Sequence, residues 1–317
     1  MRKLLKKYSF VFSVSAMIVS CSNYDPKKND SPTRGEINIL ADEGYRTLME
    51  DFKFYFTNTY PDAQININYT SETDALNKLI TTDYRIAVLG CEPGENEKNY
   101  FKSKGLTYYT KAIGYDAIVL IVNKDTPIDS LHMDEVKSLI KGEITSLNQL
   151  KKNASDTKLQ LLFDSPGSGL ARYLVKTFLK EGTQLPGHFA ATNSNREVIE
   201  NIKKNKNLIG FINYNLISDK DDTLAQRIKR EVKVLYLSSA TDSVSYFKPA
   251  QTTIADKSYP LVRTIYAINR EGKSGLGTGF VIFMADHKGQ RIMLKAGMVP
   301  AVFPGRDVRI VRKNIAL

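Results

Sequence analysis

The stretch Y-D-A-I-V-L-I-V-N-K-D, residues 115–125, decides the fold class of this 317-residue chain. Its centre, residues 117–122, is apolar throughout, and Asn123, Lys124 and Asp125 end it. A continuous apolar run of this length is typical of a strand that is buried on both faces of a mainly parallel sheet. The flanking sequence should therefore supply helices that cover both faces.

The rest of the chain alternates short β-rich runs with helical patterns. This alternation is typical of an α/β fold with right-handed crossovers between parallel strands. Apolar residues recur at helical spacing within 48–56, 75–80, 170–178 and 198–202. Further strands are predicted over 37–40, 65–69, 86–89, 159–163 and 208–212.

Most candidate ligand-binding residues follow the predicted strands directly, and Asn193 and Ser194 precede the helix predicted over 198–202. In α/β sheets the ligand crevice lies at the carboxyl ends of the strands, where loops lead into helix N-termini. Small and hydroxyl residues there leave backbone N–H groups free to face an anion. A plain N-cap is the simpler interpretation of Ser71, Ser168 and Ser194 when each is taken alone. The candidates are Asp42, Glu43, Gly44, Thr70, Ser71, Glu72, Gly90, Ser165, Gly167, Ser168, Gly169, Asn193 and Ser194.

The N-terminus has the layout of a bacterial lipoprotein signal. A basic start precedes an apolar run over 10–19, and Cys21 follows a small residue. The run is about half of the roughly 20 residues that a membrane span needs. We expect a signal peptide over 1–20, a lipid (palmitate) on Cys21, a flexible tether over 21–35, and a periplasm-facing protein anchored in the cell envelope. The alternative is an ordinary anchor helix with an incidental cysteine.

Composition excludes several classes of function. The net charge of +11 is spread along the chain, without the basic blocks of a nucleic-acid surface. Cys91 has no disulfide partner if Cys21 is lipidated, and a small buried residue beside a strand end is the simpler interpretation than a catalytic thiol. The three histidines are scattered singly, so no metal site is expected. No nucleophile–base pair or cofactor loop is visible, so we expect neither an enzyme nor a cofactor.

The chain resembles the phosphate-binding proteins of bacterial ABC importers, especially the lipoprotein branch common in Bacteroidetes. The resemblance runs almost from end to end and depends on eight stretches in the right order. They are I-N-I-L-A-D-E-G-Y from Ile37, Y-P-D-A-Q-I-N-I-N-Y-T-S-E from Tyr60, Y-D-A-I-V-L-I-V-N-K-D from Tyr115, I-K-G-E-I-T-S-L from Ile140, F-D-S-P-G-S-G-L-A-R-Y-L from Phe163, Y-P-L-V-R-T-I-Y-A-I-N from Tyr259, G-L-G-T-G-F from Gly275 and G-Q-R-I-M-L-K-A-G-M-V-P-A from Gly289.

This resemblance implies a type II periplasmic-binding-protein fold, with two α/β lobes joined by two hinge crossovers near Gly114 and Thr264. Lobe 1 would comprise 36–114 and 265–317, and lobe 2 would comprise 115–264. Such a protein, acting as a monomer, would capture phosphate or a related oxyanion between its lobes and deliver it to the membrane subunits of an importer. Closure around the ligand would be a hinge motion.

The sequence departs from the family at the anion-binding loop, which usually reads R-x-D-G-S-G-T. Ser168 and Gly169 match, but Asp164 stands at the arginine position and Leu170 at the threonine position. Replacing a guanidinium with a carboxylate removes a charge-assisted contact and adds repulsion. Arg172, which resembles the arginine of the Bacteroidetes branch, is therefore a further candidate. The departures favour an alternative: the same fold adapted to another solute, or to a protein partner as a receptor or envelope-complex subunit.

Overall fold

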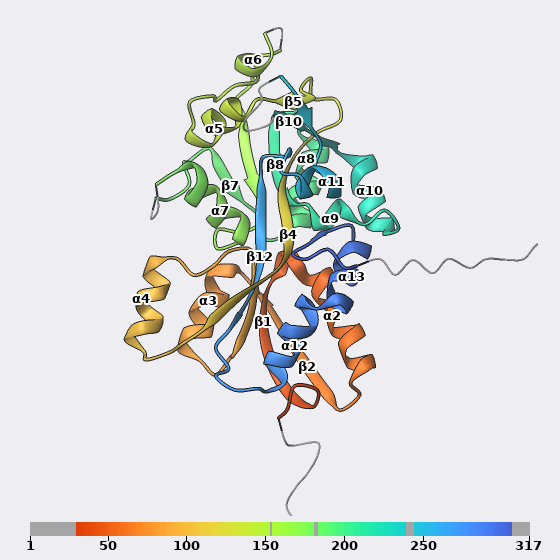
Figure 1. Cartoon of the computed structure of the whole chain (residues 1–317). Coiled ribbons are helices and arrows are strands. Elements are labelled where there is room, and N and C mark those ends of the chain that lie inside the picture. Colours follow the sequence, from red (N-terminus) through yellow and green to blue (C-terminus); the bar gives the residue numbers. More distant parts are fainter. Residues whose placement is uncertain (1–29, 153, 181–182, 239–243, 306–317) are drawn as a thin grey trace, which may run out of the picture.

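The computed structural model describes residues 30–152, 154–180, 183–238 and 244–305, which form two lobes joined by a long central ribbon (Figure 1). The predicted signal peptide, Cys21 and most of the predicted tether lie outside the described residues. Asp30, however, pairs with Arg85 at 2.9 Å and Lys273 at 2.8 Å. The end of the predicted tether is therefore part of the folded body, a feature that its polar composition did not indicate.

Two long strands, β4 (Tyr109–Val122) and β12 (Val262–Asn269), form the ribbon and run through both lobes. They pair antiparallel along the whole of β12, with Gly114 opposite Ile265 and Tyr115 opposite Thr264. All the large strands consequently belong to one 10-stranded sheet of order β2-β1-β3-β12-β4-β8-β6-β7, to which β9 and β13 add through β4. The structure thus confirms the two-lobed α/β fold and shows that the sheets of the two lobes are continuous.

Lobe 1 is built on three parallel strands, with β1 in the centre. Strand β1 is buried on both faces because Ile39 packs in the main core while Leu40 packs in a second cluster with residues of α3. The strands are β1 (Gly35–Asp42), β2 (Ala63–Thr70) and β3 (Ile86–Leu89), followed late in the chain by β13 (Val299–Pro300). The helices are a 3-10 turn (Glu43–Tyr45), α2 (Arg46–Thr59), α3 (Glu72–Thr81), α4 (Glu95–Ser103), α12 (Leu276–Ala285) and α13 (His287–Lys295).

Lobe 2 repeats this plan, with β6 pairing parallel to β7 and β8. A separate small sheet of order β11-β10-β5 closes its far end. The strands are β5 (Ser130–Leu131), β6 (Gln160–Phe163), β7 (Phe189–Ala191), β8 (Leu208–Asn213), β9 (Lys233–Val234), β10 (Tyr236–Ser238) and β11 (Tyr246–Phe247). The helices are α5 (Met133–Lys141), α6 (Leu147–Leu150), α7 (Gly169–Phe178), α8 (Asn195–Lys204), α9 (Asn215–Ser218), α10 (Thr223–Glu231) and α11 (Gln251–Ala255).

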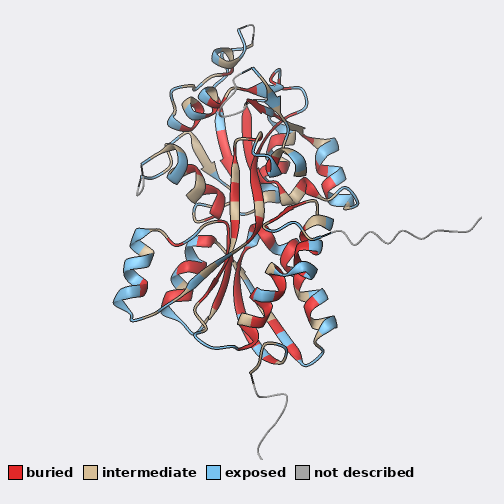
Figure 2. Cartoon of the chain, in the orientation of Figure 1, coloured by how far each residue is buried: buried red, intermediate tan, exposed pale blue. Residues whose placement is uncertain are grey.

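The strands and helices predicted from apolar patterning are all present, and the apolar run 117–122 is fully buried. Burial is concentrated along the central strands and on the helix faces that cover them (Figure 2). Strand β4 begins eight residues before that run, at Tyr109, because its more polar first half pairs with β12. Within the described part of the chain, no helix combines the length and the apolar character that a membrane span requires.

Candidate functional site

The ends of several strands converge where the lobes meet. Asp42 ends β1, and Glu72 opens α3 just after β2. Gly169 opens α7 in lobe 2, and its N–H donates to Asp42 Oδ2 at 3.1 Å. A second contact joins the lobes beside it, where Thr73 N donates to the Gly167 carbonyl at 3.0 Å. The loops that the sequence selected in the two lobes therefore lie against one another, and the lobes are closed.

Two buried carboxylates occupy the backbone donors at this junction. Glu72 is fully buried, and its Oε2 accepts from the N–H of Gly90 at 2.8 Å. Asp42 accepts from Gly44 N at 2.7 Å through Oδ1, as well as from Gly169 through Oδ2. These N–H groups belong to a strand end and helix starts, which are the positions that bind oxyanions in α/β proteins. The carboxylate oxygens thus stand where the oxygens of an anionic ligand can be held.

The close approach of these carboxylates favours glycine at position 169. A Cβ atom there would lie 2.5 Å from Glu72 Oε2 and 2.9 Å from Asp42 Oδ2. Neither carboxylate could keep its place against such an atom. A side chain at position 169 would therefore displace these carboxylates from the hydrogen bonds that they make with Gly90 and Gly169.

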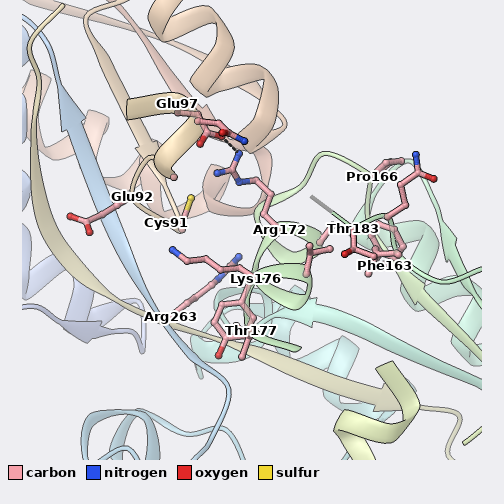
Figure 3. Close-up of a pocket in the computed structure, with 18 of the residues that line it drawn as sticks. Cys91, Glu92, Glu97, Phe163, Pro166, Arg172, Lys176, Thr177, Thr183 and Arg263 are labelled. Carbon is pink, nitrogen blue, oxygen red and sulfur yellow. Dashed lines mark hydrogen bonds and ion pairs between the residues drawn. The ribbon is translucent and has the colours of Figure 1, made fainter. Parts of the chain in front are cut away.

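Arg172 lies on α7 and reaches across to lobe 1. Its Nε is 3.2 Å from Glu72 Oε1, and its Nη1 is 2.8 Å from Glu97 Oε1; Figure 3 shows the contact with Glu97. The sequence suggested Arg172 as the cation for an oxyanion. In this closed form two carboxylates of the chain itself neutralise its charge, so Arg172 could serve a ligand only by exchanging these partners.

A second arginine, which the sequence analysis did not select, lies deeper. Arg263 on β12 is only 4% exposed and donates to Asp116 Oδ2 through Nε at 3.1 Å and Nη2 at 2.7 Å. Its Nη1 has no hydrogen-bond partner among the described residues. The guanidinium also lies over the ring of Tyr45, 5.3 Å from its centroid. Arg263 thus keeps the N–H groups of Nη1 free within the junction.

Several other buried polar atoms near the junction have no hydrogen-bond partner within the described residues. One of these atoms is the Tyr45 hydroxyl oxygen, which lies near Arg263 Nη1. A Cβ atom on Gly90 would lie 2.7 Å from the Tyr45 hydroxyl oxygen and 3.1 Å from Arg263 Nη1. Buried polar groups are normally satisfied, so atoms left over at one place indicate a position for water or ligand. The remaining atoms are Asp116 Oδ1, Asn195 Oδ1, Asn213 Oδ1 and Asn215 Oδ1.

The carboxylates at the junction are electrostatically coupled. Burial, together with the nearby charge of Glu72, raises the pKa of Asp42 to about 7, although Arg263 opposes the shift. Burial also raises the pKa of Asp164, whose Oδ1 accepts from Ser165 N at 2.9 Å. Asp42 therefore holds its proton much more readily than an exposed carboxyl group does.

This coupling predicts a pH dependence of stability. A carboxyl group whose pKa is raised by folding stabilises the folded state below its unfolded pKa, and this stabilisation is lost as the pH rises towards the folded value. We expect the melting temperature of the protein to fall between about pH 4 and pH 7, and to fall less in Asp42→Asn. Thermal unfolding followed by circular dichroism measures both slopes. Glu43→Gln, at an exposed neighbouring carboxylate, is the control, and equal slopes in all three proteins would contradict the assignment.

Some residues selected from the sequence do not take part in these contacts. Glu43 is exposed and pairs with Arg46 at 2.7 Å, and the exposed Asn193 donates to Glu197. Ser71, Ser168 and Ser194 are indeed N-caps, accepting from Asp74 N, Ala171 N and Glu197 N. Ser71 nevertheless faces lobe 2, since a Cβ on Gly167 would lie 2.9 Å from its Oγ. Thr70 lies close to Asp74.

Cys91 is half-buried, and its thiol donates to Glu72 Oε1 at 2.8 Å. Burial and the neighbouring Glu72 raise the pKa of this thiol, which disfavours the nucleophilic thiolate. Among the residues that the structure describes, no group of three or more histidine, cysteine or acidic side chains is arranged to hold a metal ion.

A two-lobed α/β fold with convergent anion-type donors between the lobes defines a solute-binding protein. Residues 26–288 match the family model described as "PBP superfamily domain". Because this match covers most of the chain, the protein belongs to the PBP superfamily, in agreement with the resemblance found in the sequence.

Named relatives support the same fold. The "Phosphate-binding protein PstS" of Staphylococcus aureus strain bovine RF122 / ET3-1 is 21% identical over 305 residues, which cover 94% of this chain and 89% of that protein. A putative phosphate ABC transporter substrate-binding protein from Clostridium perfringens, solved with bound phosphate, has a TM-score of 0.68 and 20% identity over 84% of this chain and 100% of its own. An ABC-type phosphate transport receptor from Vibrio cholerae has a TM-score of 0.65 and 18% identity over 84% and 99%.

Proposed function

We propose that the protein is a solute-binding receptor that captures phosphate, or a closely related oxyanion, between its lobes for an ABC-type importer. The observation that carries the proposal is the set of donors at the junction. The N–H groups of Gly90 and Gly169 and the guanidinium of Arg172 already hold carboxylate oxygens there. The named relatives, which are phosphate-binding or phosphate-transport proteins by name, agree with this choice of ligand.

Binding would exchange one set of oxygen atoms for another. The lobes would separate about crossovers near Gly114 and Thr264, and Asp42 and Glu72 would release their donors to the incoming anion. A protonated oxyanion carries O–H groups as well as acceptors, so a carboxylate left beside it can accept a hydrogen bond. Reclosure would then bury the ligand between the two proposed lobes. Lobe 1 comprises 36–114 together with 265–317, and lobe 2 comprises 115–264. Since one chain supplies both walls, the receptor would act as a monomer.

Isothermal calorimetry of the chain from Ser22 onward tests the function. We expect phosphate to bind with a 1:1 stoichiometry and more tightly than sulfate, which lacks a proton to donate to the carboxylates at neutral pH. The panel should include arsenate and molybdate, each at pH 6 and pH 8. An absence of heat with every oxyanion, from a protein shown to be folded, would contradict the proposal.

The buried carboxylates favour a second candidate, a receptor for another solute or for a protein partner. Asp42, Glu72 and Asp164 together suit a ligand that donates hydrogen bonds or carries positive charge. Adding small amines and amino acids to the same calorimetric panel separates the two candidates. Binding of an amine without binding of any oxyanion would select the second.

We further propose that the protein is exported as a lipoprotein anchored through Cys21. Cys21→Ser should prevent lipid attachment and leave the protein soluble or unprocessed. Metabolic labelling with palmitate and membrane fractionation measure both effects, with Cys91→Ser as the matched cysteine control. A Cys21→Ser protein that still takes up label and still sediments with membranes would refute the assignment.

A further inference from the structure

A large cavity opens beside the junction. Its volume is about 960 Å³, which is at the upper end of the range of about 300–1,000 Å³ that is typical of sites for small organic ligands. Lobe 1 supplies one wall through the β3–α4 loop (Gly90, Cys91, Glu92 and Gly94) and the first turn of α4 (Asn96 and Glu97). Lobe 2 supplies the other wall through α7 and the ends of β6 and β7. An inorganic anion with five heavy atoms would leave most of this space unfilled.

Three cationic side chains, Arg172, Lys176 and Arg263, line one end of the cavity, together with the carboxylates Glu92 and Glu97. Lys176 lies one helical turn after Arg172 on α7, and Figure 3 shows its amine extending towards Arg263 and Cys91. Lys176 is exposed and makes no hydrogen bond or ion pair with another described residue, so its amine is free to meet a ligand. Arg263 is almost fully buried, and its Nη1 has no hydrogen-bond partner within the described residues. An unsatisfied guanidinium N–H that is removed from water strongly favours an anionic oxygen.

The other end is apolar and aromatic. Phe163 and Phe189 line it with their rings edge to face, 5.9 Å between centroids, and Leu185 completes the surface. Figure 3 places Phe163 and Pro166 at the end opposite Cys91 and Glu92. The cavity therefore offers cations at one end and an apolar surface at the other, which is the pattern of a site for an amphiphilic anion.

We propose that this cavity binds a phosphomonoester with an apolar organic group. The phosphate lies between Lys176 and Arg263, next to Gly90 and Arg172, which line the same end of the cavity. The organic group packs on Phe163, Leu185 and Phe189. This inference rests on the proposed phosphate function and extends it, because it makes the ester, rather than the free ion, the ligand that fills the site.

Calorimetry with phenyl phosphate, inorganic phosphate and phenol provides the test. We expect phenyl phosphate to bind on the order of tenfold or more tightly than phosphate, because its ring leaves water for an apolar surface, and phenol to bind weakly. Lys176→Gln should weaken binding of phenyl phosphate by roughly ten- to a hundredfold, the usual effect of losing a hydrogen bond to a charged group. Lys180→Gln, which removes the same charge just beyond α7, is the matched control.

A substitution at the apolar end separates the two parts of the ligand. Ala191 lines this end at an exposed position, so tryptophan can be accommodated there without disturbing the core. Ala191→Trp should lower the affinity for phenyl phosphate more than the affinity for inorganic phosphate. Phosphate binding with no preference for the ester, or an ester affinity indifferent to both substitutions, would overturn this inference and leave the proposed function standing. Failure of both phosphate and its ester to bind would overturn the two together.

Discussion

Arg263→Met is expected to lower the free energy of unfolding by about 3–5 kcal/mol, because removing one partner of a buried ion pair leaves the other charge uncompensated. Asp116, fully buried, accepts two hydrogen bonds from this guanidinium and would retain neither. Nearby Asp42 would also lose a stabilising positive charge, so its pKa should rise further. Urea denaturation followed by circular dichroism measures the change.

The double variant Asp116→Leu with Arg263→Met is the control for this prediction. Replacing both members of a buried ion pair with apolar side chains is often nearly neutral, so the double variant should recover most of the lost stability. If the double variant is as unstable as Arg263→Met alone, lost packing around the arginine, rather than the unpaired Asp116 charge, is the cause.

Glu72→Gln is expected to strengthen phosphate binding at pH 8 by on the order of ten- to a hundredfold. The carboxylate both occupies the N–H of Gly90 and repels an anion at the same place, and juxtaposed like charges cost several kcal/mol. The amide carries no negative charge, so its oxygen holds the Gly90 N–H less strongly and no longer repels the anion, and Arg172 is released from one of its two ion pairs. Calorimetry at pH 8 gives the affinity directly.

Asp74→Asn is the matched control for Glu72→Gln. It removes the same charge from the first turn of α3, but at an exposed position. It should change phosphate affinity little. A loss of affinity in Glu72→Gln would mean that Glu72 accepts a hydrogen bond from the bound oxyanion and is part of the binding surface.

Apolar patterning predicted the strands well because a strand that is buried on both faces consists of consecutive apolar residues, which can be recognised in the sequence. Strand β4 is an example, since its buried half reads as one unbroken apolar run. The part of β4 before that run was missed because it is buried through its pairing with β12, and the sequence of one strand does not reveal its partner. The same holds for Asp30, whose polar surroundings read as a tether but whose ion pairs lie far along the chain.

The candidate site was predicted only in part, for the same reason. Strand-end residues such as Asp42, Glu72 and Gly169 could be selected because the α/β pattern fixes where strands end. Arg263 and Asp116 lie inside strands and are opposite one another in the β4–β12 ladder, 147 positions apart in sequence. A charged residue at an inward position of an apolar strand was the available signal. The ion pair could not be predicted from it, because the sequence does not show which strand lies beside it.

Arg172 shows a further limit. Its position on the first turns of α7 followed from the sequence, yet its partners Glu72 and Glu97 lie on two different helices of the other lobe. Which carboxylates meet a given cation depends on how the lobes close. In the closed form Asp42 and Glu72 lie against Gly169 of the other lobe, a contact that no pattern along the chain encodes.

The shared β4–β12 ladder also limits how such a receptor can be re-engineered or can diversify. Excising either lobe would strip a partner from one of these strands and leave a long unpaired edge, which invites aggregation. Lobes therefore cannot be exchanged between relatives as independent domains, in contrast to domains that are joined only by a linker. New specificities must arise instead through the short loops at the strand ends and through the walls of the cavity beside them, with the ribbon kept intact.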